Sequence, residues 1–572
     1  MECQIQTDSE TVPLRKSSRR TVPFLILGIG SLYLILWLLI PKPSFWGLDS
    51  GFKYQGAVAF SQTGSITVPY RGVDFDPRGS FRPMLRPFGV LLPDGRQAPV
   101  FSVVFMLIAG VLFRVFGAVG PYLLPLFGGW LSLVGGWFLW KRMRPNHSPV
   151  PFLTILTLGT PLLFYSLTLW EHSLAMAMVL FCLGLILRDS DHPRGYRAWE
   201  PLVAGFIIAL GSGFRTELIL FALVMTLSWK VIAGSFRGWI PYIVGLALGL
   251  LLCGAINFWQ TGTPLPLHVL TNLRPTPAGS LFGALLRRVS NLYILIAEGF
   301  KSAPVSLILL IPLLLMPFRK WLFPKIPWMH LLAVLTICTW LMYILNALTA
   351  KDGISYTLHS GGLLWVSPVM ALSLIPISRS FKSVWGFLWL GSYLCIALVA
   401  LITSTSSGVH WGPRFILSFL PMLAFIAAIR LQYWWNHYAH SRFLLIVLLS
   451  LSFVNQAYSY NLLLKAHHQN ADLNRWAVVD HPEPALSTLW WLPGDCALLS
   501  DKDPWFISAT KGRIRKLISG LRSEGIASAH IFELPPYLEQ QFWWSVGVEQ
   551  GESDYFLEGG GELRRTRLKI IP

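Results

Sequence analysis

Charged residues are scarce in this chain of 572 amino acids. Asp, Glu, Lys and Arg together make up 13% of it, while 53% of the residues are hydrophobic; a soluble domain has roughly 25% charged residues. The apolar residues fall into blocks of about 20, the length at which a helix crosses the hydrocarbon core of a bilayer. This composition excludes an ordinary soluble protein and predicts a polytopic membrane protein.

Several motifs typical of enzymes and metal sites are missing as well. The six cysteines form no close pair, and four of them lie inside apolar blocks, so neither a disulfide framework nor a zinc site is indicated. There is no Walker-type glycine-rich loop and no HExxH, CxxC or GxSxG motif, so the chemistry does not use those devices. Acids within the apolar blocks are too few for the proton relay of a pump. No internal repeat or low-complexity tract stands out.

The net charge of +18 comes from basic residues that gather in short clusters between apolar blocks. Examples are Arg15–Arg20, Lys141–Arg144 and Arg430–Arg442. Cytoplasmic loops of membrane proteins carry such clusters, so the charge indicates topology, and we expect no nucleic-acid partner. Residues 1–21 are then a cytoplasmic basic N-terminus. The first block, Val22–Ile40, is an uncleaved span, because Pro41-Lys42-Pro43 follows it in place of a cleavage site.

Alternation of basic and less basic turns predicts about thirteen spans in a membrane domain over residues 22–460. Between residues 99 and 140 this alternation allows one crossing for two apolar blocks. We therefore expect the first, Val100–Phe116, to lie along or dip into the outer interface, and Leu123–Trp140 to cross. The later spans are expected near 149–168, 171–188, 198–213, 215–230, 238–257, 300–318, 328–349, 361–377, 383–403, 414–430 and 442–460.

Two regions lie outside the lipid. Residues 41–98 form a large first outer loop, too long and polar for a simple connection. The tail, residues 461–572, has mixed charge and short alternating apolar runs, which predict a small extracytoplasmic α/β domain. The expected fold is thus an all-α polytopic membrane protein with a small C-terminal α/β domain.

The first outer loop begins with Leu48-Asp49-Ser50-Gly51-Phe52-Lys53-Tyr54. A carboxylate directly after a span can act as a general base or bind a metal. Alternatively, Asp49 or Ser50 is the N-cap of an interfacial helix.

The same loop holds several arginines outside the membrane, against the positive-inside trend. Arg78 and Arg82 are suited to grip phosphate oxygens, because the guanidinium binds them bidentately. The alternative is that Asp74 and Asp76 pair with them on a solvated loop.

Charged residues also stand at hinges between spans. Glu171 and His172 follow Trp170, where the carboxylate can hold a sugar hydroxyl or a metal; alternatively, both residues cap the next helix. Arg215 and Glu217 break an apolar stretch, where a purely structural ion pair is the alternative to substrate binding.

Two further turns face outward. One contains Asn257 and Gly262-Thr263-Pro264. The other is His410-Trp411-Gly412-Pro413-Arg414-Phe415, which opens the penultimate span and places Arg414 at the outer leaflet, where it suits an anion.

These motifs, taken in order over about residues 20–430, resemble the GT-C superfamily of integral-membrane glycosyltransferases. The similar branch contains the aminoarabinose transferase, the protein O-mannosyltransferases and the bacterial RgtA/B/C/D-like proteins. The carrying motifs are Leu48–Tyr54, Glu171-His172, Gly213–Glu217, the Asn257–Pro264 turn and Trp411–Phe415.

The resemblance implies an inverting transfer of a sugar from a polyprenyl-phosphate donor to a glycan, lipid or protein acceptor, on the extracytoplasmic side of a bacterial inner membrane. Asp49 would be the base, with Glu171 and His172 as further catalytic residues. Substrate-binding roles would fall to Lys53, Arg78, Arg82, Arg215, Glu217, His410 and Arg414. The family's second acid is often aspartate, so a requirement for Mg²⁺ or Mn²⁺ stays open. The rival hypotheses are a transporter or flippase for lipid-linked sugars, and a non-catalytic membrane scaffold.

Overall fold

The fold is known from a computed structural model. It describes residues 18–70, 72–85, 87–187, 197, 199–233, 236–272, 281–297, 331, 334–338, 340–341, 361–374, 383–403, 411–439, 441–477, 483–496, 505–534, 537–558 and 561–571. The chain divides into two compact units, each described here by itself. The first unit comprises Met1–Trp37, Pro125–Cys253 and Pro275–Leu462, and the second comprises Leu38–Leu124, Gly254–Arg274 and Leu463–Pro572.

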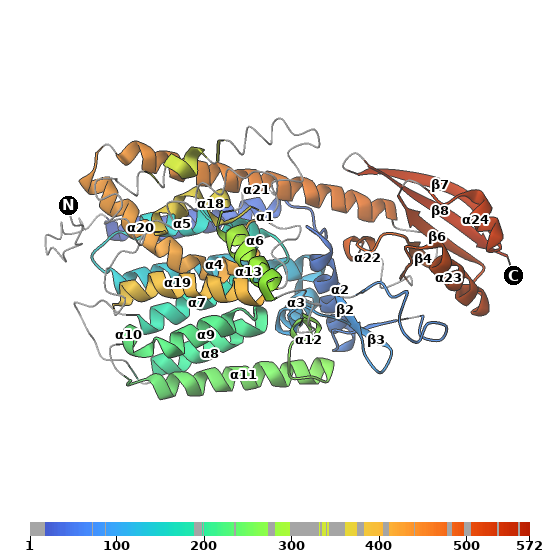
Figure 1. Cartoon of the computed structure of the whole chain (residues 1–572), viewed down its shortest axis with the longest axis horizontal. Coiled ribbons are helices and arrows are strands. Elements are labelled where there is room, and N and C mark those ends of the chain that lie inside the picture. Colours follow the sequence, from blue (N-terminus) through green and yellow to red (C-terminus); the bar gives the residue numbers. More distant parts are fainter. Residues whose placement is uncertain are drawn as a thin grey trace. The chain divides into compact units, whose positions relative to one another are not determined.

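The first unit is helical throughout its described residues. Figure 1 shows α7, α8, α9 and α19 running along a common direction. The helices that lie wholly or largely in this unit are α1 (Ser18–Leu38), α4 (Gly120–Met143), α5 (Val150–Leu158), α6 (Leu162–Leu167), α7 (His172–Ile186), α8 (Trp199–Phe214), α9 (Leu218–Leu227), α10 (Trp229–Ala233), α11 (Trp239–Thr261), α13 (Leu281–Ala297), α18 (Leu363–Val366), η4 (Pro368–Ser373), α19 (Val384–Ile402), η5 (Arg414–Phe419), α20 (Leu420–His437) and α21 (Ser441–Ala477).

Within the described residues, six helical stretches are long and apolar enough to cross a membrane. Arg414–His437 is 89% buried, whereas Thr21–Leu38 and Trp239–Thr261 are each 22% buried. The apolar side chains that α1 and α11 expose are those that a lipid environment accommodates. The predicted integral membrane protein, mostly helical, is therefore confirmed, while the number of thirteen spans stays a prediction.

Several expected spans differ from the helices that the structure has. The stretch 149–168 is divided into α5 and α6 at Gly159-Thr160-Pro161, because proline lacks the amide hydrogen that a helix interior requires. The stretch 361–377 is the short α18 followed by the 3₁₀ helix η4, which begins at Pro368. Helix α21 instead runs on to Ala477, 17 residues beyond the predicted end. The expected span 300–318 and most of 328–349 lie outside the described residues.

Glycines let α8 and α11 approach closely. A Cβ atom at Gly245 would stand 1.9 Å from the Leu202 carbonyl oxygen, and one at Gly205 would stand 2.1 Å from the Tyr242 carbonyl oxygen. Small residues at contacts are typical of helix pairs in membranes, where close packing replaces the hydrophobic effect as the main attraction.

The second unit begins with helices from the first outer loop and a small sheet. Its elements here are α2 (Leu48–Thr63), α3 (Val103–Phe116), the 3₁₀ helix η1 (Gly117–Val119) and α12 (Leu267–Asn272), with β1 (Val68–Pro69), β2 (Gly89–Leu91) and β3 (Arg96–Pro99). The strands form an antiparallel sheet in the order β1-β3-β2. Helices α3 and α4 are separate, as expected for the two apolar blocks; the interfacial position of α3 stays a prediction.

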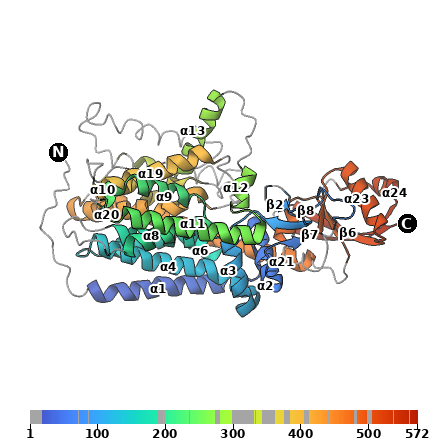
Figure 2. The ribbon, with the colours of Figure 1, turned by 90° about the horizontal axis from the view of Figure 1, so that it is seen from below.

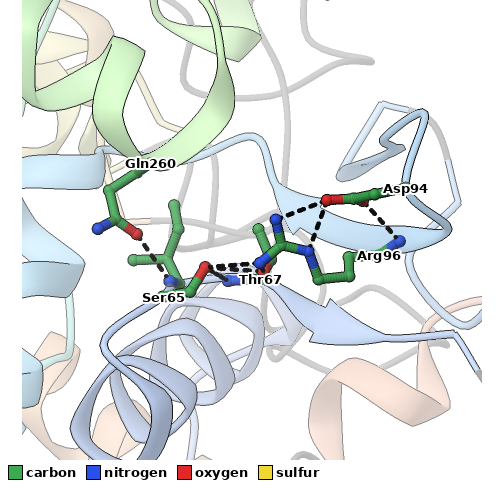
Figure 3. Close-up of polar contacts among 6 residues, drawn as sticks. Ser65, Thr67, Asp94, Arg96 and Gln260 are labelled. Carbon is green, nitrogen blue, oxygen red and sulfur yellow. Dashed lines mark hydrogen bonds and ion pairs between the residues drawn. The ribbon is translucent and has the colours of Figure 1, made fainter.

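The end of α11 holds this loop in place (Figure 3). Gln260 accepts a bond from the Ile66 amide at 3.0 Å and donates to the Gly64 carbonyl at 3.2 Å. Arg96 pairs with Asp94 and donates to Thr67 at 3.0 Å. Gln260, near the end of α11, therefore has a structural role in anchoring the loop.

The C-terminal part of the second unit is a five-stranded sheet in the order β5-β4-β6-β8-β7, parallel among its first three strands and antiparallel in the rest. Helix α23 packs on it through the buried Ile514, Leu517, Ile518 and Leu521 (Figures 1 and 2). The elements are β4 (Ala485–Ser487), α22 (Leu492–Asp495), β5 (Trp505–Ile507), α23 (Lys511–Ser523), β6 (Ser528–Glu533), α24 (Gln540–Ser545), β7 (Val548–Glu558) and β8 (Gly561–Ile570).

The first outer loop belongs to the same core as this sheet. Tyr70 and Phe81 are buried with the sheet and with α23, and the Ile507 amide of β5 donates to the Phe81 carbonyl at 2.8 Å. Loop and tail, which lie about 400 residues apart in the sequence, therefore form one folded body.

Candidate functional site

A buried charged cluster stands at helix ends in the first unit. Arg215 lies between two carboxylates: its Nη1 is 3.2 Å from Glu171 Oε1, and its Nε is 2.8 Å from Glu217 Oε1. The three side chains are 15%, 5% and 10% exposed, respectively. An ion pair so poorly hydrated needs good geometry on both sides to be stable, and the double contact supplies it.

The sequence places these residues at chain reversals. Arg215-Thr216-Glu217 links α8 to α9, and the Arg215 amide still donates to the Gly211 carbonyl, so the linker is a tight continuation of α8. Glu171 stands at the N-cap position of α7, but its side chain makes no capping hydrogen bond. Glu171 thus takes the capping position without a capping hydrogen bond, and its carboxylate pairs with Arg215.

Aromatic rings surround the charges. The Arg414 guanidinium lies 5.5 Å from the centre of the Trp170 ring and 4.9 Å from that of Phe415. Arg215 lies 6.0 Å from the centre of the same Phe415 ring, so both arginines are close to this ring. Cations over ring faces are attracted by the ring quadrupole, more strongly where water is excluded.

His172 is fully buried and is part of this aromatic surround. Its ring centre is 4.5 Å from that of Tyr165 and 5.2 Å from that of Trp170, with which it stacks. This packing favours a positioning role for His172, by fixing the Trp170 ring that Arg414 faces.

The turn before Arg414 is held by backbone geometry. The Tyr165 hydroxyl donates to the Trp411 carbonyl at 2.9 Å. Gly412 has φ +70°, and a Cβ there would stand 3.0 Å from Val366 Cγ2 and 3.3 Å from Pro161 Cγ. Only glycine fits this turn without strain. His410, expected to bind substrate, lies outside the described residues.

Asp49 and Lys53 lie on α2 in the second unit. The N-cap of α2 is Gly47, and Asp49 stands in the first turn, so the hypothesis that Asp49 or Ser50 is the N-cap is wrong. An acid in that turn interacts favourably with the helix dipole. Lys53, four residues on and thus on the same face, is 3% exposed with its ammonium 5.1 Å from the Phe101 ring centre.

Arg78 and Arg82 also belong to the second unit. Arg82 donates to the carbonyls of Met84 at 2.9 Å and Gly79 at 3.0 Å, while Arg78 is exposed. Asp76 accepts bonds from the Tyr70 hydroxyl at 2.7 Å and from the Phe81 amide at 2.8 Å, so its carboxylate orders the loop.

A divalent metal does not fit the charged cluster well. Glu171 and Glu217 both place an oxygen on the Arg215 guanidinium, whose positive charge would repel a cation bound between them. Among the described residues, no three His, Cys, Asp or Glu side chains form a group that could hold a metal ion.

The structure thus brings four predicted residues, Glu171, Arg215, Glu217 and Arg414, into one neighbourhood, and a fifth, His172, stacks on the Trp170 ring. Sequence reasoning missed the aromatic partner Tyr165, and it gave no role to Trp170 and Phe415 although both stand in predicted motifs. Two of these adjoin predicted charges in the sequence, at Trp170-Glu171 and Arg414-Phe415, which is a usable signal.

No family model and no curated protein matches the chain. Among solved structures, the chain is similar to ArnT from Cupriavidus metallidurans bound to undecaprenyl phosphate, with a TM-score of 0.48 and 11% identity over 95% of this chain and 98% of that one. The apo state of that protein gives a TM-score of 0.45 and 12% identity over 96% and 98%.

Proposed function

We propose that this protein is a glycosyltransferase that moves a sugar from a polyprenyl-phosphate donor to an acceptor hydroxyl at the extracytoplasmic face of a membrane. The observation that carries the proposal is the buried cluster of Glu171, Arg215 and Glu217, with Arg414 and Arg215 both close to the Phe415 ring. Ionisable groups among membrane helices are costly, and they mark substrate sites by default.

Arg414, Arg215 and Glu171 have separate proposed roles. Arg414 binds the donor phosphate, since a guanidinium offers several N–H donors to phosphate oxygens and keeps its charge at any physiological pH. Its place over Trp170 and Phe415 limits its freedom before the ligand arrives. Arg215 fixes the Glu171 carboxylate, which in turn accepts a hydrogen bond from a hydroxyl of the sugar or acceptor.

The proposed chemical step is a displacement with inversion. The acceptor oxygen bonds to the anomeric carbon while the bond from that carbon to the phosphate oxygen breaks. The electron pair of that bond stays on the phosphate, which Arg414 stabilises, and the acceptor proton passes to the Asp49 carboxylate. The products are the glycosylated acceptor and polyprenyl phosphate.

The assignment of Asp49 as base rests on the resemblance of the first-loop motif to that of the GT-C superfamily. The donor class is that of the undecaprenyl phosphate named for the ArnT structure. Placement in a bacterial inner membrane, with the N-terminus cytoplasmic and the tail outside, is proposed from the charge pattern.

The test is sugar transfer by the purified full-length protein in lipid nanodiscs, with radiolabelled sugar on polyprenyl phosphate and a membrane glycan extract as acceptor. Asp49→Asn and Glu171→Gln keep the size and much of the hydrogen bonding of the native side chains. We expect each to lower turnover by at least a hundredfold while thermal unfolding stays near that of the native protein. Asp94→Asn, in the same loop and exposed, is the matched control and should keep full turnover.

Other outcomes would reject the proposal. A scaffold would show no transfer, and Asp49→Asn would leave its phenotype unchanged. A flippase would move the labelled lipid between leaflets of a vesicle without breaking the bond between sugar and phosphate.

A further inference from the structure

A pocket of about 800 Å³ lies in the second unit between the first outer loop and α23. Its walls come from residues 75–85 of the loop and from Arg513 and Lys516 of the helix. Ligand sites commonly have volumes of about 300–1,000 Å³, so there is room for a sugar unit and a charged substituent.

The pocket is lined by cations. Arg78 and Arg82 contribute from the loop, and Arg513 and Lys516 from α23. The single carboxylate in its wall, Asp76, is 6% exposed and already accepts bonds from Tyr70 and Phe81. Four positive charges therefore face one negative charge within the pocket lining, which attracts an anion.

Two of the cations are held in place before any ligand binds. Arg82 donates to the carbonyls of Met84 and Gly79. Arg513 donates to the Ser80 carbonyl and lies 5.5 Å from the centre of the Phe81 ring. Fixed cations lose little side-chain entropy on binding, which favours affinity.

The remaining two cations stand at the exposed edge. Arg78 and Lys516 are exposed, and neither pairs with an acid among the residues that the structure describes. The aromatic side chains of Phe75 and Phe81 add an apolar part to the same lining, suited to the non-polar face of a sugar ring.

Packing makes this arrangement rigid. A Cβ at Gly520 of α23 would stand 2.4 Å from Phe75 Cδ2, so loop and helix are in close contact there. The buried face of α23 lies on the sheet, which leaves Arg513 and Lys516 on the other face.

We propose that this pocket binds an acidic saccharide, a sugar unit that carries a phosphate, sulfate or carboxylate group, and that this unit belongs to the acceptor. That this unit belongs to the acceptor rests on the proposed function, whereas the binding of an acidic saccharide does not. The unit is either part of a soluble glycan or the headgroup of a glycolipid, and the two sources share the chemistry that the pocket recognises.

The experiment measures binding to the full-length protein in neutral nanodiscs, with a fluorescent galacturonate tetrasaccharide as the acidic probe and maltotetraose as the neutral one. We expect the acidic probe to bind and the neutral probe to bind at least tenfold more weakly. The double variant Arg78→Ala/Lys516→Ala should weaken binding of the acidic probe at least tenfold.

The matched control is Lys511→Ala/Arg515→Ala, which removes two exposed charges from the same helix outside the pocket. It should change the affinity less than twofold. Equal weakening by both double variants, or equal binding of both probes, would overturn the proposal, because either shows non-specific attraction or none. Competition by vesicles of an acidic glycolipid, lost only in the pocket variant, would identify the lipid source.

Failure of this proposal is distinguishable from failure of the proposed function. Binding of the acidic probe without sugar transfer would reject the transferase and leave the pocket. Transfer that Arg78→Ala/Lys516→Ala leaves unchanged, with no loss of probe binding, would reject the pocket and leave the transferase.

Discussion

The Arg215 guanidinium holds two carboxylates in a place where few water molecules reach it. Removal of one partner from such a group leaves uncompensated buried charge, which costs more than the pair contributes when intact. This asymmetry separates the cluster from surface pairs such as Asp94 and Arg96, whose side chains are 47% and 45% exposed.

Arg215→Ala is therefore expected to lower the free energy of unfolding by about 3–5 kcal/mol, since Glu171 and Glu217 would stay buried without their cation. Arg96→Ala should cost less than about 1 kcal/mol. Thermal unfolding of both variants in the same nanodiscs checks this. Equal losses of stability would show that the cluster is hydrated and has no special cost.

The pair of Glu483 and His530 makes the stability of the C-terminal sheet depend on pH. Burial lowers the pKa of His530, and the nearby Glu483 only partly opposes this. Burial would raise the pKa of Glu483, but hydrogen bonds from Arg567 and Ser528 and the charge of His530 outweigh it and leave that pKa lowered. Both groups thus bind fewer protons when folded than when unfolded.

Stability should therefore fall as the pH drops below about 6.5, first through His530 and then, towards 4.5, through Glu483. Hydrogen exchange in β4 and β6, corrected for intrinsic rates, should be faster at pH 5 than at pH 7. The variant Glu483→Gln/His530→Gln should show a smaller difference. Slower corrected exchange at pH 5 would contradict the sign.

The long apolar helices agree well with those predicted from the sequence. In lipid, a block of about 20 apolar residues can satisfy its backbone hydrogen bonds only as a helix. The breaks are less predictable. Pro161 and Pro368 interrupt stretches of uniform hydropathy, and a running average of hydropathy does not register them. Helix α21 extends past its apolar part because its end packs on the C-terminal sheet through Leu473 and Ala477.

Gly412 controls the turn that presents Arg414. Gly412→Ala should lower sugar transfer at least tenfold, because φ +70° and the contacts with Val366 and Pro161 both resist a Cβ. Gly262→Ala is the matched control, with φ +72° but no atom within 4 Å of the added Cβ. It shares the backbone cost of about 1–2 kcal/mol and should keep transfer activity. Transfer lost equally in both variants would argue against a specific role of the turn.

The close contact between α8 and α11 depends on glycines that leave no room for a side chain. Gly245→Ala should lower the free energy of unfolding by about 1–3 kcal/mol, because the added methyl group meets backbone of α8 that cannot easily move. Gly28→Ala in α1, where nothing lies within 4 Å, should be neutral or stabilising. Thermal unfolding compares the two. A neutral Gly245→Ala would show that the helices are further apart than described.

Over the whole molecule, sequence reasoning found the membrane character and four members of the charged cluster, since charges are rare enough in apolar sequence to stand out. It did not find that the first outer loop and the tail share one core. The contacts of Tyr70 and Phe81 with the sheet join positions about 400 residues apart, and no local pattern encodes such a pairing. That pairing also forms the basic pocket, which the sequence therefore could not predict. Its cations are Arg78, Arg82, Arg513 and Lys516.

The central claim is that the charged cluster of the first unit binds the phosphate of the donor, and the affinity of the protein for polyprenyl phosphate tests it most directly. Arg414→Ala should weaken binding about tenfold to a hundredfold, because a hydrogen bond to a charged group contributes about 1.5–3 kcal/mol. Arg442→Ala is the matched control, since that guanidinium also faces a tryptophan ring, Trp435, at 5.7 Å. Unchanged affinity in Arg442→Ala with the predicted loss in Arg414→Ala would support the account. Equal affinities of the native protein and Arg414→Ala would contradict it.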